Sequence, residues 1–197
     1  MRFSLGLTGS IGMGKSTTAQ MFTDEGCALW DADAAVHRLY AKGGAAVEPM
    51  REVFPSAIVE GAVSREELKQ TIANDPAALK VIENIVHPLV AADRAAFREG
   101  ASADILVFDI PLLFETGGDA AMDAVACVSI PADEQKRRVM ARGTMTEAQF
   151  EQIRVKQMPN EEKCARSDYV ILTDTLDHAR AQVQDIIRQI RAGIADA

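Results

Sequence analysis

Residues 9–16 read Gly-Ser-Ile-Gly-Met-Gly-Lys-Ser and match the pattern G-x-x-x-x-G-K-[ST] at every fixed position. An apolar run at residues 3–7 precedes this pattern, and a run typical of a helix, residues 17–25, follows it. Strand, glycine loop and helix in this order are the context in which the pattern marks a phosphate site. Glycine lets the loop turn its backbone N–H groups toward phosphate oxygens, and the positive end of the helix favours the same anion. The chain is therefore predicted to bind a nucleoside triphosphate.

The side chains of this loop have distinct expected roles. Lys15 is expected to reach the β- and γ-phosphates, and the Ser16 hydroxyl is expected to bind Mg²⁺. Met13 is expected to contribute its backbone and not its sulfur.

Short apolar runs elsewhere predict the rest of a sheet. They are continuous and do not alternate, which is typical of a parallel sheet that is covered on both faces. Helical segments separate them, so right-handed β-α-β crossovers are expected. The predicted fold class is α/β, a three-layer P-loop NTPase fold with a five-stranded parallel sheet. The five expected strands are residues 3–7, 27–30, 105–108, 124–130 and 169–172.

Two helical insertions are expected in this fold. Strand signals almost vanish between residues 33 and 100, and helix starts appear at Ser64, Asp75-Pro76 and His87-Pro88. A crossover needs far fewer residues, so this insertion is expected to bind a substrate.

The second insertion is expected to be a helical lid, with a capping box at Thr146. The predicted domains are a nucleotide-binding core (1–33, 104–131 and 167–197), an acceptor-binding insertion (34–103) and the lid (132–166).

Charge is distributed unevenly along the chain. The net charge of −8 argues against a general nucleic-acid or membrane surface. Residues 134–166, however, hold eight Lys or Arg against five Asp or Glu. This basic segment indicates either a flap over phosphates or a solvated helical face.

The three cysteines, Cys27, Cys127 and Cys164, include no C-x-x-C pair, and they indicate reduced thiols in a cytoplasmic protein. Cys27 and Cys127 are expected to be buried. Neither a signal peptide nor an apolar run of membrane-spanning length is apparent.

Acidic residues follow two of the expected strands. Asp31 and Asp33 come directly after the second strand, and the carboxyl ends of parallel strands meet at the ligand crevice. Asp33 is the candidate for the base that accepts a hydroxyl proton, while Asp31 would orient the loop. The alternative is that both residues only form a turn and a helix cap. Asp109 ends an apolar strand and is expected to hold the hydration shell of Mg²⁺.

The segment after Asp109 reads Ile-Pro-Leu-Leu-Phe-Glu, and its apolar residues, Leu112 among them, would line a substrate pocket or form a hydrophobic plug.

Arg138 and Arg142 are four residues apart on an expected helix, so they share a face and suit a phosphate clamp. Surface arginines are the alternative, and Arg137 is expected to be one. His87 by itself would more often be a cap or a core residue than a ligand contact.

These segments together resemble dephospho-CoA kinases along nearly the whole chain. The resemblance rests on residues 7–17 and on the motifs Asp31-Ala32-Asp33, His87-Pro88, Asp109-Ile110-Pro111-Leu112-Leu113-Phe114-Glu115, Gln135-x-x-Arg138-x-x-x-Arg142, Gln157 and Ser167-Asp168-Tyr169-Val170-Ile171.

The resemblance implies transfer of the γ-phosphate of ATP to the ribose 3′-hydroxyl of dephospho-CoA, with Mg²⁺, as the last step of coenzyme A synthesis. It implies that Asp33 is the base, Arg142 the lid arginine and His87 part of the acceptor site. It also implies that ATP is held by Gly12, Met13, Gly14, Lys15, Ser16 and Thr17. One departure is that Thr173 stands where the family usually has Asn, which leaves the contact near the adenine open.

Two other functions are compatible with the glycine loop. A kinase of a nucleoside monophosphate or another small molecule would share the fold and the lid. A nucleotide-dependent switch would normally carry Asn-Lys-x-Asp for guanine, and this tetrapeptide is absent from the sequence. The expected partners are small-molecule substrates, with no nucleic acid or membrane, in a monomer or weak homo-oligomer.

Overall fold

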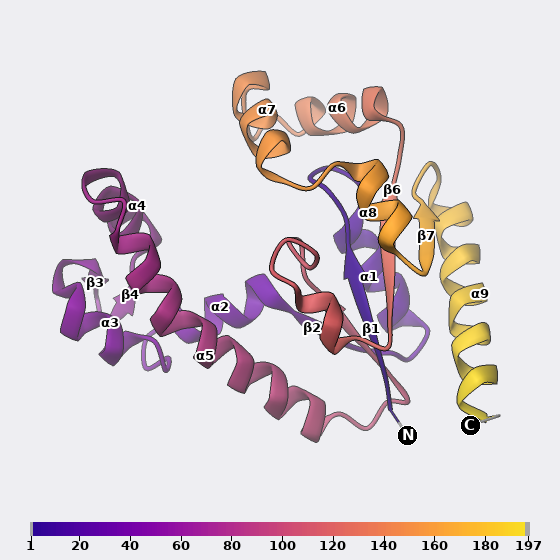
Figure 1. Cartoon of the computed structure of the whole chain (residues 1–197), viewed down its shortest axis with the longest axis horizontal. Coiled ribbons are helices and arrows are strands. Elements are labelled where there is room, and N and C mark those ends of the chain that lie inside the picture. Colours follow the sequence, from indigo (N-terminus) through magenta and orange to yellow (C-terminus); the bar gives the residue numbers. More distant parts are fainter. Residues whose placement is uncertain (1, 196–197) are drawn as a thin grey trace. The chain divides into compact units, whose positions relative to one another are not determined.

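All five expected strands form one parallel sheet in the computed structural model, which describes residues 2–195 (Figure 1). The strands are β1 (Phe3–Thr8), β2 (Ala28–Asp31), β5 (Ile105–Asp109), β6 (Ala124–Ser129) and β7 (Tyr169–Leu172). Their order is β2-β5-β1-β6-β7, and β1 runs parallel to both of its neighbours. The prediction of a five-stranded parallel sheet is confirmed.

One face of this sheet carries the main hydrophobic core. Leu5 and Leu7 of β1 point to this face, as do Ile105 and Val107 of β5, because alternate residues of a strand share a face. Two helices, α1 (Lys15–Asp24) and α9 (Leu176–Ala195), cover it. The expected apolar stripe of α9 is confirmed, since its buried residues are Ala179, Val183, Ile186, Ile187 and Ile190.

The opposite face is covered by the segment after β5 and by helix α8 (Asn160–Arg166), which packs against β6. Leu113 lies directly over Gly6, where an added Cβ would come within 2.7 Å of the Leu113 Cδ2 atom. A larger residue at position 6 would therefore push this covering segment off the sheet. Trp30 packs with Phe108 at a ring-centroid distance of 6.1 Å, as expected for a core residue. Helices on both faces give the predicted three layers.

The chain divides into two compact units, and the second comprises residues 31–100. It contains helices α2 (Ala32–Tyr40), α3 (Val47–Val53), α4 (Arg65–Asn74) and α5 (Ala78–Gly100). Its own core includes Val47, Met50, Leu68, Ile82 and Val86. Because this cluster is separate from the core on the sheet, the unit has an apolar interior of its own.

The second unit differs from its prediction in two places. Two short strands, β3 (Ile58–Val59) and β4 (Ala62–Val63), form a hairpin that the sequence analysis did not predict. Its turn residues Glu60 and Gly61 both have positive φ, as a two-residue type I′ turn requires. Strands of two residues are too short to show an alternating pattern.

The expected helix start at His87-Pro88 is wrong, because both residues lie inside the continuous helix α5. Pro88 removes one N–H donor and would normally break a helix. Here Pro88 is on the exposed side of the helix, and the buried residues Ala78, Ile82 and Val86 keep the helix packed. The start expected at Ser64 is confirmed, because the Ser64 Oγ accepts from the Glu67 N–H. The start expected at Asp75-Pro76 is displaced: α5 begins at Ala78, and the Asp75 carboxylate accepts from the Ala77 N–H in the turn before it.

Candidate functional site

The glycine loop joins the central strand β1 to helix α1 and is shaped by two glycines with positive φ. Gly12 has φ 78° and Gly14, the residue before α1, has φ 89°. At Gly12 an added Cβ would lie 2.4 Å from a methyl carbon of Val139, so this position also requires a close approach. Ser16 and Thr17 are exposed at the start of α1. The loop therefore presents the amino end of a helix to solvent, which suits an anion.

A buried acid lies beside the loop lysine. Asp109 ends β5 and is 2% exposed, and its carboxylate forms an ion pair with the Lys15 ammonium. This pairing gives the buried carboxylate a counter-charge, and it places Lys15 and Asp109 at the same edge of the sheet. The Asp109 carboxylate and the Ser16 hydroxyl are hard oxygen ligands of the kind that Mg²⁺ prefers. Residues 2–195 contain no cluster of three or more His, Cys, Asp or Glu side chains that could bind a metal by themselves.

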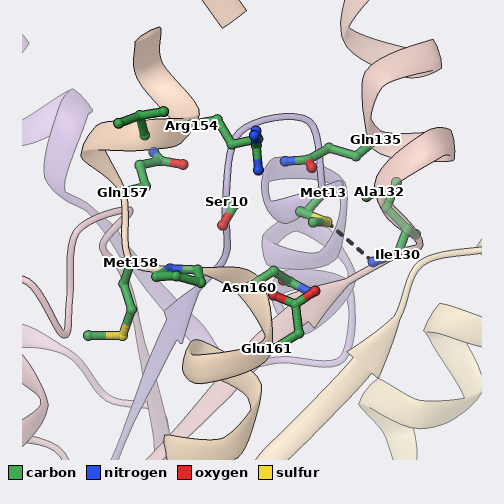
Figure 2. A pocket seen from close by; sticks show the side chains of 12 residues that line it. Ser10, Met13, Ile130, Ala132, Gln135, Arg154, Gln157, Met158, Asn160 and Glu161 are labelled. Carbon is green, nitrogen blue, oxygen red and sulfur yellow. Dashed lines mark hydrogen bonds between the residues drawn. The ribbon is translucent and has the colours of Figure 1, made fainter. Parts of the chain in front are cut away.

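Hydrogen bonds tie the loop and the strand before it to neighbouring segments. The Thr173 hydroxyl donates to the Met13 carbonyl at 2.7 Å, and the hydroxyl of Thr8, the last residue of β1, donates to the Pro111 carbonyl at 3.1 Å. The Met13 sulfur accepts from the Ile130 N–H at 3.2 Å (Figure 2). Met13 was expected to contribute its backbone alone, and its sulfur in fact ties the loop to the end of β6.

A pocket of about 240 Å³ opens beside the loop, between α6 (Ala132–Ala141), the end of α7 (Glu147–Lys156) and the start of α8 (Figure 2). Ser10 and Met13 line it from the loop. Asn160 lines it from α8, donates to the Ser129 hydroxyl at 2.8 Å, and has a buried Oδ1 with no hydrogen-bond partner among the described residues. The pocket is smaller than the roughly 300–1,000 Å³ that small-molecule sites usually have. The open start of α1 is therefore the better place for a triphosphate.

The arginines of α6 have different surroundings. Arg138 donates to the Glu134 carboxylate and to the carbonyls of Thr173 and Asp174, the latter two at 2.8 and 3.3 Å. The guanidinium groups of Arg137 and Arg138 lower the pKa of Glu134 to about 2. Arg137 is exposed, as expected.

Arg142 directly follows α6 and is exposed. Within residues 2–195, Arg142 forms no ion pair or hydrogen bond through its side chain. Other basic side chains of the lid segment (132–166) are paired: Lys136 with Glu147, Arg154 with Glu151, and Arg166 with Asp119. Of the two arginines expected to clamp phosphate, Arg142 is thus the one with its guanidinium available. The capping box at Thr146 is confirmed.

The apolar residues of the segment after Asp109 are of two kinds, buried and exposed. Leu113 and Phe114 are buried and pack with Val125, so this part is the hydrophobic plug. Leu112 is 42% exposed and remains available to a substrate. The guanidinium of Arg166 lies 4.5 Å from the centre of the Phe114 ring and covers the plug.

A buried lysine that the sequence analysis missed lies under this segment. Lys163 of α8 is 0% exposed, pairs with the Glu115 carboxylate at 2.9 Å and donates to the Pro111 carbonyl at 3.0 Å. Burial acts to raise the pKa of Glu115, but the Met158 N–H and the Lys163 ammonium outweigh it and lower that pKa below its usual value. This pair joins the end of the lid segment to the residues that follow Asp109. A lysine in a charged segment normally indicates a solvated side chain, so no sequence signal marked it.

The remaining predicted site residues belong to the second unit. Asp31 caps α2, with its carboxylate accepting from the Ala34 N–H at 2.8 Å. Asp33 lies in the first turn of α2 and is exposed. Its carboxylate accepts no hydrogen bond from any residue of the described chain. His87 is exposed on α5. The cap alternative is therefore confirmed for Asp31, whereas Asp33 is not used as a cap.

Comparison with known proteins identifies the family. The model of the dephospho-CoA kinase family matches residues 3–178. The chain belongs to the dephospho-CoA kinase family. It is 83% identical to a dephospho-CoA kinase of Ruegeria pomeroyi, with 98% of each chain covered. A crystal structure of the Thermus thermophilus protein TT1252 is 31% identical and superposes with a TM-score of 0.84, covering 95% of this chain and 97% of that one.

A dephospho-CoA kinase from Campylobacter jejuni has the same fold, with 23% identity and a TM-score of 0.72, covering 98% of this chain and 99% of that one.

The structure shows what Thr173, the departure from the usual family motif, does in this chain. Its side chain packs against Gly14, where an added Cβ would lie 3.2 Å from it, and its hydroxyl holds the Met13 carbonyl. In this member of the dephospho-CoA kinase family, Thr173 thus contacts and stabilises the phosphate loop.

Proposed function

We propose that this protein transfers the γ-phosphate of ATP to the ribose 3′-hydroxyl of dephospho-CoA and releases coenzyme A and ADP, the last step of coenzyme A synthesis. Membership of the dephospho-CoA kinase family over residues 3–178 carries this proposal. The site supports it, because the phosphate loop is complete, its Lys15 pairs with the buried Asp109, and Arg142 is exposed.

The phosphates of ATP bind along the loop and the start of α1. The backbone N–H groups of residues 12–17 surround them, since positive φ at Gly12 and Gly14 turns the loop around an anion. Lys15 then exchanges its contact with Asp109 for the β- and γ-phosphates. Its ammonium balances the charge that develops on the transferred group.

The acceptor hydroxyl loses its proton to Asp33. The residue comes two positions after the end of β2, a strand of the same parallel sheet as β5, and residues that follow the strands of such a sheet commonly bind ligands. Its carboxylate is exposed and not used as a helix cap, which leaves it available to accept a proton. His87, Leu112 and Arg138 are proposed to contact the substrates.

Arg142 is proposed to stabilise the phosphoryl group in transit. Its guanidinium is exposed at the end of α6. A planar group with five donors suits the equatorial oxygens of that phosphoryl group. Residues 132–166 act as the lid that carries it, residues 34–103 receive dephospho-CoA, and residues 1–33, 104–131 and 167–197 hold ATP.

Mg²⁺ fits the oxygen ligands of the site. Ser16 would contribute its hydroxyl and Asp109 its carboxylate, and such a small set is typical because Mg²⁺ keeps several waters and takes phosphate oxygens as further ligands. When bound, the ion neutralises charge on the β- and γ-phosphates. We place the protein in the cytoplasm as a monomer or weak homo-oligomer. Consistent with this, no helix within residues 2–195 has the length and apolar character to cross a bilayer.

An ADP-release assay with a panel of acceptors tests the proposal. Dephospho-CoA, AMP, CMP and shikimate are offered at equal concentration with ATP and Mg²⁺. ADP release that depends on dephospho-CoA is expected. A preference for AMP or CMP would assign the protein to the nucleoside monophosphate kinases instead, and tight GTP binding without any transfer would indicate a switch.

A further inference from the structure

The two peptide units on either side of Ile11 in the phosphate loop are each held by a glutamine side chain from the lid segment. The Gln135 amide donates from Nε2 to the Ile11 carbonyl at 2.7 Å. The Ile11 N–H donates to the Gln157 Oε1 at 3.1 Å. Figure 2 shows the two glutamines approaching the loop from different elements, Gln135 from α6 and Gln157 from the end of α7. Both hydrogen-bonding groups of residue 11 are thereby satisfied by the lid segment.

The two glutamines lie at the two stems of the lid. Gln135 is in the first turn of α6 and is 4% exposed, and Gln157 is the C-cap residue that directly follows α7. The residues between them include Arg142. The lid is thus attached to the loop where its helical hairpin begins and where it ends.

Packing strengthens this attachment. Val139 of α6 lies so close to Gly12 that a Cβ at position 12 would be 2.4 Å from its methyl carbon. The same added Cβ would also lie 3.4 Å from the Gln135 carbonyl oxygen. A change in the orientation of the Ile11–Gly12 backbone must therefore move α6 or break its contacts.

We propose that Gln135 and Gln157 are positioning residues that couple occupancy of the phosphate loop to the placement of Arg142. The proposal rests on the function proposed above. Phosphate bound at the loop fixes the backbone on both sides of Ile11. The hydrogen bonds from Gln135 and Gln157 to Ile11 then fix the start of α6 and the end of α7. In this proposal the glutamines act on the reaction through the loop and the lid arginine.

The polarity of the two hydrogen bonds gives a sharp test. Gln157→Glu keeps an oxygen acceptor for the Ile11 N–H, whereas Gln135→Glu replaces a donor with a second acceptor facing a carbonyl. At saturating ATP and dephospho-CoA, Gln157→Leu, Gln135→Leu and Gln135→Glu are each expected to lower kcat about 3- to 10-fold, roughly the factor of one hydrogen bond. Gln157→Glu is expected to remain within about 2-fold of the wild type. Its added charge is expected to raise KM for ATP instead.

Gln152→Leu is the matched control, because Gln152 is an exposed glutamine of the same helix α7. It is expected to leave kcat and KM unchanged. Equal kcat values for the Glu and Leu variants at position 157, or wild-type kcat in the Leu variants, would overturn the proposal. A lower melting temperature of the Leu variants with unchanged kcat would assign the glutamines a purely structural role. That result would also overturn the proposal.

A double-mutant cycle with Arg142→Ala tests the route of the coupling. If Gln157 acts through Arg142, Gln157→Leu should lower kcat by less than about 2-fold in the Arg142→Ala background. The same factor in both backgrounds would show that the two residues act independently, contrary to the proposal.

A further measurement separates this proposal from the proposed function. A non-hydrolysable ATP analogue is added without any acceptor, and amide hydrogen exchange is followed in residues 142–156. Slower exchange in the wild type but not in Gln157→Leu is expected whichever acceptor the enzyme uses. Equal slowing in both proteins would reject the coupling even if dephospho-CoA is the substrate.

Discussion

At the scale of single residues, the proposed base is a carboxylate that forms no helix cap. Asp31 accepts a backbone N–H and caps α2, while Asp33, two residues later, is exposed in the first turn of that helix. One acid therefore fixes the start of the helix, and the other projects from it. This division leads to a prediction about the proton acceptor.

Asp33→Asn is expected to lower kcat by roughly 10²–10⁴, because an amide cannot accept the proton of the attacking hydroxyl. The affinity for ATP should be largely kept, and both quantities can be measured by steady-state kinetics and by nucleotide titration. Asp31→Asn is the control, since asparagine is as good a helix cap as aspartate. A kcat near the wild-type value in Asp33→Asn would exclude this residue as the base.

The three cysteines allow a second residue-scale prediction. Burial raises the pKa of Cys127 to about 12 and that of Cys27 to about 11, so both thiols are protonated at pH 8 and lie inside the protein. The thiolate is the reactive form, so both should react with a thiol reagent only after unfolding. Cys164 is half-buried and should react first. Cys164→Ser should remove the fast phase of labelling, and rapid labelling of Cys127 in the folded protein would contradict this burial.

At the scale of elements, an ion pair with one buried member links α8 to the segment after β5. The Lys163 ammonium is fully buried, and its partners are the Glu115 carboxylate and the Pro111 carbonyl. Removing Lys163 takes away the donor of both contacts, although Glu115 is exposed and keeps the Met158 N–H.

Lys163→Met should therefore lower the free energy of unfolding by about 1 kcal/mol, the net contribution of a typical hydrogen bond, as measured by chemical denaturation. Lys156→Met is the matched control, because Lys156 is exposed at the end of α7, and its stability should match that of the wild type. If the two variants were equally stable, the Lys163–Glu115 pair would have no part in holding α8 to the sheet.

The elements also show what the sequence could predict. Continuous apolar runs gave all five strands, and capping residues such as Ser64 and Thr146 gave correct helix starts, because these signals are local. His87-Pro88 gave a wrong start, since packing of α5 overrode the local preference of proline. Contacts between distant segments were not predictable. Gln135 and Gln157 lie 124 and 146 residues from Ile11, and no local pattern indicates such a pairing.

At the scale of the whole molecule, function requires an acidic protein to hold a polyanion. The net charge is −8, and the loop supplies one lysine. Bound cations must therefore contribute the remaining positive charge that balances the triphosphate. Mg²⁺ is the expected contribution, with Ser16 and Asp109 as its protein ligands.

Removal of divalent ions with EDTA should abolish phosphate transfer, and added Mg²⁺ should restore it. ATP with Mg²⁺ should raise the melting temperature more than ATP with EDTA, because a ligand that binds only the folded state stabilises it. Asp109→Asn should reduce this Mg²⁺-dependent difference. Full transfer in the presence of EDTA would contradict a role for the metal.

In the proposed reaction the terminal phosphoryl group of ATP moves to the ribose 3′-hydroxyl of dephospho-CoA. A rapid-quench single turnover with ATP labelled in its γ-phosphate, excess enzyme and dephospho-CoA follows this transfer. We expect the label to appear in coenzyme A, at the 3′ position, as it disappears from ATP. Label recovered only as inorganic phosphate, or at another position of the acceptor, would contradict it.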